Sequence, residues 1–221
     1  HKRLENLFRW TKNKPELFSF LWIDPTEPDI YEQIEESVSA GIAGFKIICN
    51  HFYPSDKRLI TALQHIASRN KPVLFHSGIL WDGDISSRYN RPLEFEPLFE
   101  IKGLRFALAH ISWPWTDELI ALVGKYFHTP MALSNKTKMF IDLTPGTPEI
   151  YRKEVLFRLL KSGYKLTENI IFGSDCRTEQ YDYRWAERWI RKDTAIFNGI
   201  GLSSFQINCI FCQNFFRFLN G

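Results

Sequence analysis

Short apolar runs alternate with longer amphipathic segments along the whole chain of 221 residues. Six runs rich in β-branched and aromatic side chains cover residues 17–23, 43–49, 72–76, 104–110, 138–142 and 169–173. Uninterrupted apolar runs of this length are typical of strands buried on both faces, as in a parallel sheet. The segments between them predict helices over residues 29–40, 56–69, 116–126 and 148–162. This alternation predicts βαβ units and therefore an α/β fold.

Polar residues recur in or just after successive apolar runs. Lys46, His76, His110, Asp142 and Asp175 follow one another at intervals of 30 to 34 residues, about one βα unit each. In a parallel barrel, this spacing places all five at the C-terminal mouth, where barrel enzymes keep their catalytic groups. An open doubly wound sheet would instead spread them along an edge. The spacing therefore favours a barrel that forms a single domain over residues 1–221.

Composition argues against several kinds of partner. The chain has 28 Lys and Arg against 25 Asp and Glu, a net charge of +3, with both signs dispersed. This balance gives no basic patch for nucleic acid or for an anionic membrane surface. No apolar run approaches the ~20 residues that span a bilayer. We therefore expect a small-molecule partner, with no nucleic acid and no membrane.

Cysteine usage points to a reducing environment. Cys49 and Cys176 lie beside predicted strand ends, whereas Cys209 and Cys212 form a C-x-x-C pair in an apolar, helix-like tail. No second pair or nearby histidine completes a zinc motif. We interpret all four as free thiols in a cytoplasmic protein.

Three of the strand-end residues have side chains that bind metals. His76 and His110 end successive apolar strands, and Asp175 ends another two units later. Imidazole and carboxylate ligands at a site with open positions are typical of catalytic zinc. A single histidine at such a position could equally be a core residue with its hydrogen bonds satisfied. The convergence of all three on one mouth favours a metal site.

The long connection between residues 79 and 103 is the candidate substrate-binding segment. Arg88 and Arg91 offer forked donors for a carboxylate, and Trp81 offers a stacking face. Trp113, shortly after the strand that ends at His110, would line the mouth of the barrel with apolar surface. Alternatively, the segment is a solvated loop in which the arginines pair with acidic neighbours, namely Asp82, Asp84, Glu94 and Glu96.

These strand endings resemble those of the amidohydrolase superfamily, in particular its amidohydrolase-2 branch, which includes aminocarboxymuconate-semialdehyde decarboxylase. The matching motifs are FHSG at 75–78, AHIS at 109–112, FGSD at 172–175, GIAGFK at 41–46 and IFCQNFFRFL at 210–219. Each motif alone is weak, but their order and spacing are specific. The resemblance covers residues 16–219 and implies a TIM (β/α)8-type barrel.

The resemblance also implies roles for the site residues. His76 would bind a divalent metal, with zinc as the first choice and manganese or iron as alternatives. His110 would bind metal or act on substrate and water, and Asp175 would bind metal and take a proton from water. The implied activity is metal-dependent hydrolysis of a small, carboxylated organic molecule, or non-oxidative decarboxylation at the same site. Relatives of this kind are often dimers, so a homo-oligomer is a further expectation.

Lys46 and Asp142 each have two interpretations. In some amidohydrolases a lysine at the strand of Lys46 is carbamylated and bridges two metals, but a substrate contact or a structural ion pair is the favoured interpretation here. Asp142 either orients a histidine or caps the turn at Thr144.

The chain departs from the family pattern at its beginning. The family's first strand ends in a His-x-His pair, which has no counterpart here, because no apolar strand precedes His1. Six of eight strands are visible, so we expect a barrel that lacks its first two strands and part of its metal site. From another functional class, the alternative is a metal-free pseudoenzyme or binding subunit.

Overall fold

The computed structural model describes residues 2–11, 13–177 and 180–221. Its six strands form one parallel sheet in sequence order, each strand paired with the next. The strands are β1 (Phe20–Trp22), β2 (Gly44–Ile47), β3 (Val73–Phe75), β4 (Arg105–Leu108), β5 (Lys138–Asp142) and β6 (Ile170–Ile171). All six predicted strands are confirmed, and the architecture is the parallel α/β sheet of a TIM-type barrel with six strands. His1, considered above for a His-x-His pair, lies outside the described residues.

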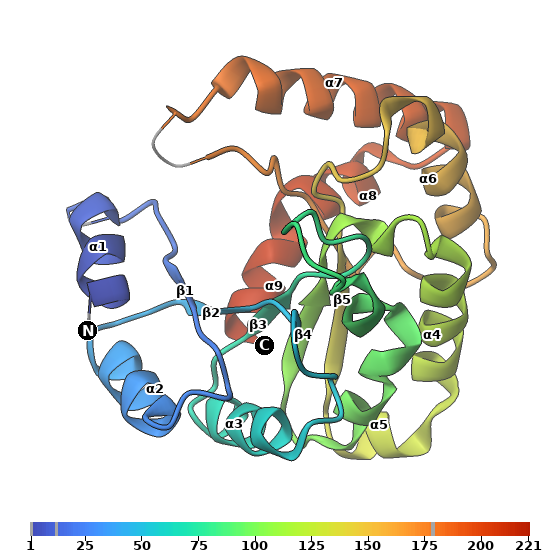
Figure 1. Cartoon of the computed structure of the whole chain (residues 1–221). Helices are drawn as coiled ribbons and strands as arrows, with labels where there is room; N and C mark the ends of the chain where they lie inside the picture. Colours follow the sequence, from blue (N-terminus) through green and yellow to red (C-terminus); the bar gives the residue numbers. More distant parts are fainter. Residues whose placement is uncertain (1, 12, 178–179) are drawn as a thin grey trace.

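Helices cover the outer side of this sheet (Figure 1). The four predicted helices are confirmed as α2 (Ile30–Ser39), α3 (Lys57–Ser68), α4 (Thr116–His128) and α6 (Arg152–Leu160). Asp56 caps the N-terminus of α3, since its side chain accepts a hydrogen bond from Arg58 N.

Several further elements complete the fold. They are α1 (Lys2–Thr11), α5 (Pro130–Ser134), α7 (Tyr183–Ile200), α8 (Ser204–Asn208), a π-helical turn (Cys209–Gln213) and α9 (Asn214–Asn220). The long connection after β3 carries two 3₁₀ segments, Ser87–Asn90 and Pro92–Glu100. Phe95, Leu98 and Phe99 from the second segment are buried in the core. No helix among the described residues is long and apolar enough to cross a membrane.

Alternate residues of each strand point to opposite sides of the sheet, as strand geometry requires. On β4, Phe106 and Leu108 enter the main core beneath the outer helices, whereas Ala107 faces inward. The inward-facing side chains form a second, smaller cluster with α9, made of Ala107, Phe140, Ile171 and Phe218, with Phe20, Leu74 and Phe215 packed against it. The interior of the curved sheet is thus partly filled by the C-terminal helix.

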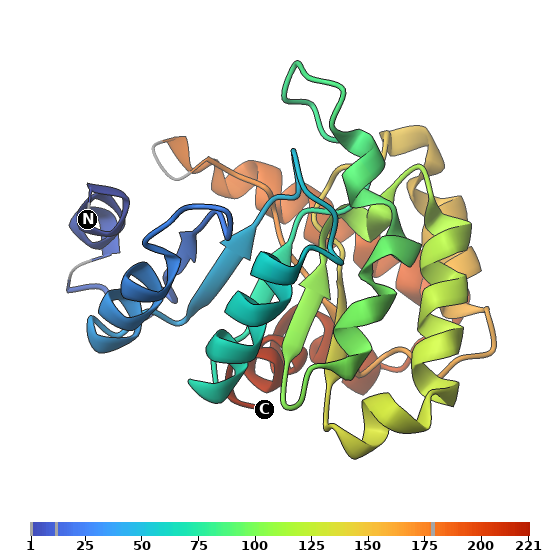
Figure 2. The same ribbon diagram turned by 60° about the horizontal axis from the view of Figure 1, so that its bottom comes forward.

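Helix α9 connects the first and last strands of the sheet. On the β1 side, the rings of Phe20 and Phe218 stack with centroids 6.0 Å apart. On the β6 side, Asn214 Nδ2 donates to the backbone carbonyl of Ile170 at 2.7 Å. The guanidinium of Arg105 holds the end of the helix by donating to the carbonyls of Phe218 and Leu219, each at 2.9 Å. Figure 2 shows α9 beneath the strands.

A buried ion pair joins α6 to α7. Arg152 and Asp193 have no exposed side-chain surface, and two hydrogen bonds of 3.0 and 2.6 Å connect the guanidinium to the carboxylate. The guanidinium also donates to Leu143 O at 2.7 Å and lies 5.1 Å from the ring centroid of Trp189. This pair anchors α7 to the β5 end of the sheet.

Candidate functional site

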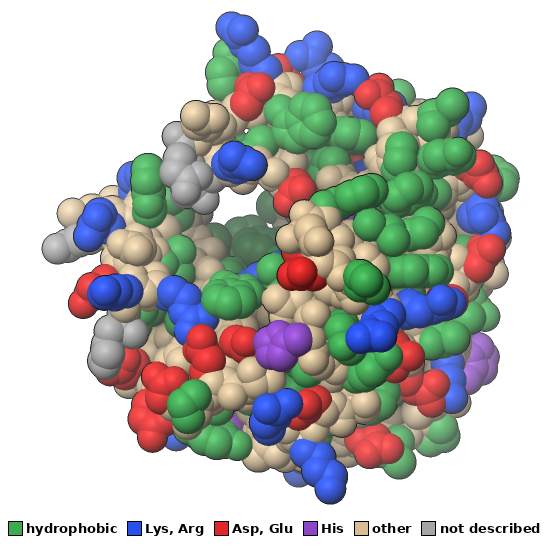
Figure 3. All heavy atoms as spheres, in the orientation of Figure 1, with side chains coloured by type: hydrophobic (Ala, Val, Ile, Leu, Met, Phe, Trp, Pro, Cys, Tyr) green, Lys and Arg blue, Asp and Glu red, His purple; other side chains and the backbone are tan. Residues whose placement is uncertain are grey.

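A pocket of about 650 Å³ opens at the C-terminal ends of the strands and extends inward to α9. One part of its wall is polar and contains Lys46, His110, Asp142, Thr144, Ser174, Asp175 and Cys176. The other part is apolar and is formed mainly by Phe18, Phe20, Leu74, Ile171, Phe172, Phe215 and Phe218. Figure 3 shows that this face of the molecule is hollowed, with hydrophobic side chains inside the hollow. The sheet therefore brings Lys46, His110, Asp142 and Asp175 to one pocket, in the arrangement that their spacing predicts.

An unusual turn holds His110 in place. His110, Ile111 and Ser112 all have left-handed backbone conformations, with φ of 62°, 51° and 51°. Such a conformation is costly for a β-branched residue such as Ile111. The Ser112 hydroxyl lies 2.7 Å from the Ser77 hydroxyl, which ties the turn to the end of β3. The chain thus maintains local strain where the imidazole enters the pocket.

Gly146 leaves the space that His110 occupies. A Cβ at this position would lie 2.7 Å from Cβ, Cγ and Nδ1 of His110. We expect Gly146→Ala to displace the imidazole and lower the free energy of unfolding by about 1–3 kcal/mol, the usual cost of overpacking. Urea denaturation measures this change. Gly199→Ala is the matched control, because nothing lies within 4 Å of its added Cβ in α7, and it should gain about 0.5–1 kcal/mol. Equal effects of the two variants would contradict the crowding at His110.

His76 lies next to His110 but does not line the pocket. Its side chain is buried, and the two imidazole centroids are 4.9 Å apart. His76 Nε2 is 3.1 Å from the carbonyl oxygen of Ile79. Burial, with smaller contributions from His110 and Lys46, lowers the pKa of His76 to about 3. His76 is therefore neutral at physiological pH, the form in which an imidazole binds metal.

The lowered pKa of His76 makes the fold sensitive to acid. Between the unfolded pKa of about 6.5 and the folded pKa of about 3, the unfolded chain binds more protons at this histidine. We expect its contribution to be complete above pH 6.5 and to fall by up to ~1.4 kcal/mol per pH unit as the pH drops. Denaturation of metal-free protein at pH 7 and pH 4.5 tests this. His76→Gln should lose less stability between these pH values than the unsubstituted chain, and an equal loss would contradict the assignment.

Asp142 caps the turn that follows β5. Its carboxylate accepts a hydrogen bond of 2.8 Å from Thr144 N and another from the Thr144 hydroxyl. Gly173 packs directly on this turn, since a Cβ there would approach the Thr144 hydroxyl to 2.5 Å. Of the two interpretations given above, the structure supports the turn cap.

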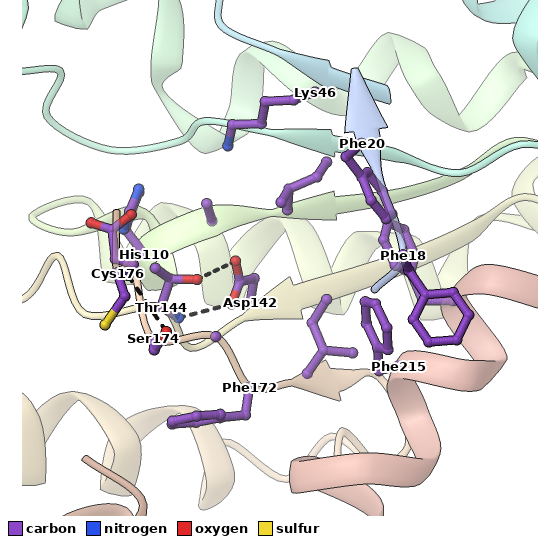
Figure 4. A pocket seen from close by; sticks show the side chains of 16 residues that line it. Phe18, Phe20, Lys46, His110, Asp142, Thr144, Phe172, Ser174, Cys176 and Phe215 are labelled. Atoms are coloured by element: carbon purple, nitrogen blue, oxygen red, sulfur yellow. Dashed lines mark hydrogen bonds between the residues drawn. The ribbon is translucent and has the colours of Figure 1, made fainter. Parts of the chain in front are cut away.

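Lys46 extends from β2 toward the polar wall (Figure 4). Burial lowers the pKa of Lys46 to about 8, against the attraction of Asp142 and Asp175, which raises it. Burial also lowers the pKa of His110, and the Lys46 charge adds to this effect, while Asp142 and Asp175 oppose it. The polar wall thus combines a cationic amine with a neutral imidazole.

Asp175 follows β6 in a left-handed conformation, with φ of 55°. Desolvation in the pocket raises the pKa of its carboxyl, against the lowering influence of His110 and Lys46. The indole N–H of Trp185, at the start of α7, donates to the carbonyl of Ser174 at 2.8 Å. Trp185 therefore holds the strand end that carries Asp175.

The other predicted substrate contacts lie outside this pocket. Trp81 is 83% exposed, and Arg88 donates to the Tyr89 hydroxyl at 2.9 Å. Arg91 pairs with Glu118 of α4, a partner 27 residues away that was not among the predicted acidic neighbours. Trp113 stacks on Tyr151 with ring centroids 6.4 Å apart. Their role in substrate binding stays a prediction.

Sequence reasoning missed the apolar part of the pocket wall. Phe215 and Phe218 reach the pocket from α9, and Phe18 and Phe20 reach it from the first strand region. The aromatic-rich tail indicates a buried segment. However, part of the surface on which it packs, such as Phe20, is separated from it by nearly the whole length of the sequence. Trp185 was missed as well, because no local pattern marks a hydrogen bond to Ser174.

The predicted ligands are residue types that bind divalent metals, but they do not form a complete set of metal ligands. His110 Nδ1 is buried and has no hydrogen-bond partner in the described part of the chain. His76 is held neutral, and Asp175 supplies carboxylate oxygens. However, among residues 2–11, 13–177 and 180–221, no three His, Cys, Asp or Glu side chains gather as a metal-binding group. These residues therefore match metal ligands in type, without forming a metal-binding group in the described part of the chain.

Comparisons with known proteins agree with this architecture. A family model described as Amidohydrolase matches residues 5–214. A search of curated protein sequences gave no significant match.

Three solved structures illustrate the similarity in fold. A 2,6-dihydroxybenzoate decarboxylase from Rhizobium has a TM-score of 0.67 and 16% identity, with 99% of this chain and 76% of that chain covered. A probable 2-pyrone-4,6-dicarboxylic acid hydrolase from Acinetobacter baumannii, with citric acid bound, has a TM-score of 0.63 and 14% identity, with 96% and 76% covered. A protein from Lactobacillus casei, classed provisionally as a metal-dependent hydrolase, has a TM-score of 0.60 and 18% identity, with 86% and 58% covered.

Proposed function

Because this chain belongs to the amidohydrolase family, we propose that it is a metal-dependent hydrolase acting on a small, carboxylated organic molecule. The observation that carries the proposal is the pocket in which Lys46, His110 and Asp175 converge. An ammonium beside a neutral imidazole and a carboxyl group can bind an anionic substrate and move protons in the same space.

Each of the three side chains has a distinct role. Lys46 binds the substrate carboxylate, since its ammonium lies at the pocket wall. His110, neutral because of its lowered pKa, accepts or donates the proton of the reacting group. Asp175, whose raised pKa favours proton uptake, takes the proton of the attacking water and passes it to the leaving group. The apolar wall excludes water from the remainder of the substrate.

His76 and Asp175 would supply protein ligands to a divalent metal, with zinc as the first choice. When bound, such a metal supplies a Lewis acid that polarises a carbonyl group. The neutral imidazole of His76 supports this role.

Non-oxidative decarboxylation is the second candidate function. It requires the same carboxylate contact and the same proton donor, so the pocket accommodates either reaction. The fold similarity to both a dicarboxylic acid hydrolase and a dihydroxybenzoate decarboxylase supports a carboxylated substrate. Incubation with a panel of aromatic and heterocyclic carboxylic acids separates the two reactions, because only decarboxylation releases CO2.

Metal analysis tests the metalloenzyme proposal directly. Protein purified from medium supplemented with zinc, manganese and iron should carry on the order of one equivalent of metal per chain. We expect His76→Ala and Asp175→Ala each to reduce this content, because each removes a ligand. Inductively coupled plasma mass spectrometry provides the measurement, and His65→Ala is the control, because His65 pairs with Glu35 of α2 and does not line the pocket. Protein that stays metal-free under these conditions would instead belong to the class of binding subunits or pseudoenzymes.

A further inference from the structure

The amine of Lys46 has no direct partner, unlike those of Lys71 and Lys125. In the described part of the chain, no hydrogen bond or ion pair engages its Nζ. By contrast, Lys71 Nζ donates to Ile42 O at 2.6 Å, and Lys125 pairs with Glu96 at 2.5 Å. Asp142 and Asp175 act on Lys46 only through longer-range attraction. The amine is therefore free to react.

The sheet places Lys46 between apolar residues of the two neighbouring strands. Lys46 pairs in register with Trp22 of β1 and Leu74 of β3. Its β2 neighbours Phe45 and Ile47 are fully buried on the outer side, so Lys46 lies on the inner side. Figure 4 shows its side chain reaching into the pocket from β2. The pocket wall thus exposes the amine to a ligand while limiting its access to bulk water.

These surroundings destabilise the protonated form of the amine. Burial lowers the pKa of Lys46 to about 8, so a substantial fraction of the side chain is unprotonated in mildly alkaline solution. A lysine desolvated in an apolar pocket is a recognised nucleophile toward carbonyl groups.

We propose that Lys46 Nζ forms an imine with an aldehyde or ketone that enters the pocket. This chemistry goes beyond the proposed hydrolase function and does not depend on a metal. The apolar wall formed by Phe20, Phe215 and Phe218 favours a carbonyl compound that carries an aromatic ring. The ligand class is therefore an aryl aldehyde or an aryl-substituted ketone.

The reaction balances with groups already present in the pocket. The Nζ lone pair attacks the carbonyl carbon, a C–N bond forms as the C=O π bond breaks, and His110 passes one Nζ proton to the carbonyl oxygen. In the resulting carbinolamine, His110 passes the second Nζ proton to the hydroxyl as the C–O bond breaks, so the hydroxyl leaves as water. The product is a C=N bond plus one water molecule, and a protonated imine would be stabilised by the carboxylates of Asp142 and Asp175.

Reductive trapping tests this proposal with benzaldehyde as the probe. The whole chain is incubated with benzaldehyde and sodium cyanoborohydride at pH 8 in the presence of a metal chelator. Peptide mass spectrometry then locates benzylated lysines over time. We expect labelling of Lys46 to be at least about tenfold faster than that of Lys57, an exposed lysine at the start of α3. Lys46→Arg should abolish the fast phase, and Lys57→Arg should preserve it.

A second measurement keeps the test decisive if Lys46→Arg fails to fold. In the unsubstituted protein, labelling of Lys46 should rise with pH through about 8, and excess benzoate should slow it. Labelling of Lys46 no faster than that of Lys57, or without protection by benzoate, would overturn the proposal. Because the chelator is present throughout, this result is independent of the metal content and hydrolysis measured above.

Discussion

Replacing Asp193 by alanine should lower the free energy of unfolding by about 3–5 kcal/mol, the largest stability effect that we expect in this chain. The variant leaves the guanidinium of Arg152 uncompensated in a fully buried position between α6 and α7. The guanidinium would keep only its bond to Leu143 O and its contact with the Trp189 ring. Urea denaturation followed by circular dichroism measures the loss.

The double variant Arg152→Met with Asp193→Leu separates charge from packing. Because it removes both charges and retains apolar volume, it should recover much of the lost stability. Glu187→Gln is the surface control, since its pairing with Arg191 is exposed on both sides, and it should change stability by less than ~0.5 kcal/mol. If Asp193→Ala costs no more than this surface variant, the pair does not anchor α7.

Replacing His110 by alanine, or Asp175 by asparagine, should reduce kcat by about 10²–10⁴-fold once a substrate is identified. Both side chains lie at the pocket wall and would move protons, while the apolar wall that binds the rest of the substrate is unchanged. The effect should therefore fall on kcat more than on KM. Steady-state kinetics on the carboxylic acid panel provides the measurement.

Two surface variants control for general damage. His65→Ala removes a histidine that pairs with Glu35 of α2, and Asp117→Asn alters an exposed aspartate that pairs with Arg158. Both should retain kcat within about twofold. Activity that survives in both pocket variants, with the fold intact by circular dichroism, would rule out these two side chains as the proton-transfer groups.

The sheet could be predicted from sequence because its signals are local. Each strand is a continuous apolar run, and the spacing from Lys46 to Asp175 alone places the polar residues at one mouth. Helices α1 and α7 were not predicted, although α7 is the longest helix of the described chain. Its polar side carries many charged residues, and its anchoring depends on Asp193, whose partner Arg152 is 41 residues away.

The detailed geometry of the site could not be predicted from sequence either, because it depends on contacts between residues that are far apart in the chain. The ion pair between Arg91 and Glu118 and the support of Ser174 by Trp185 are tertiary contacts that no periodicity encodes. The left-handed turn at His110 is less predictable still, because local preference opposes it at Ile111. Tertiary contacts, such as the hydrogen bond between Ser77 and Ser112, stabilise the turn against the backbone preference of Ile111.

The stacking of Phe218 on Phe20 has a consequence for how the protein is made. The two rings meet in space but are 198 residues apart in the chain. At ribosomal speeds of ~5–20 residues per second, roughly 10–40 s pass between the synthesis of one ring and the other. During that interval the inner surfaces of the strands have no cover from α9, and the nascent chain exposes aromatic side chains that favour aggregation. The interior can therefore be completed only after residues 214–220 have been synthesised.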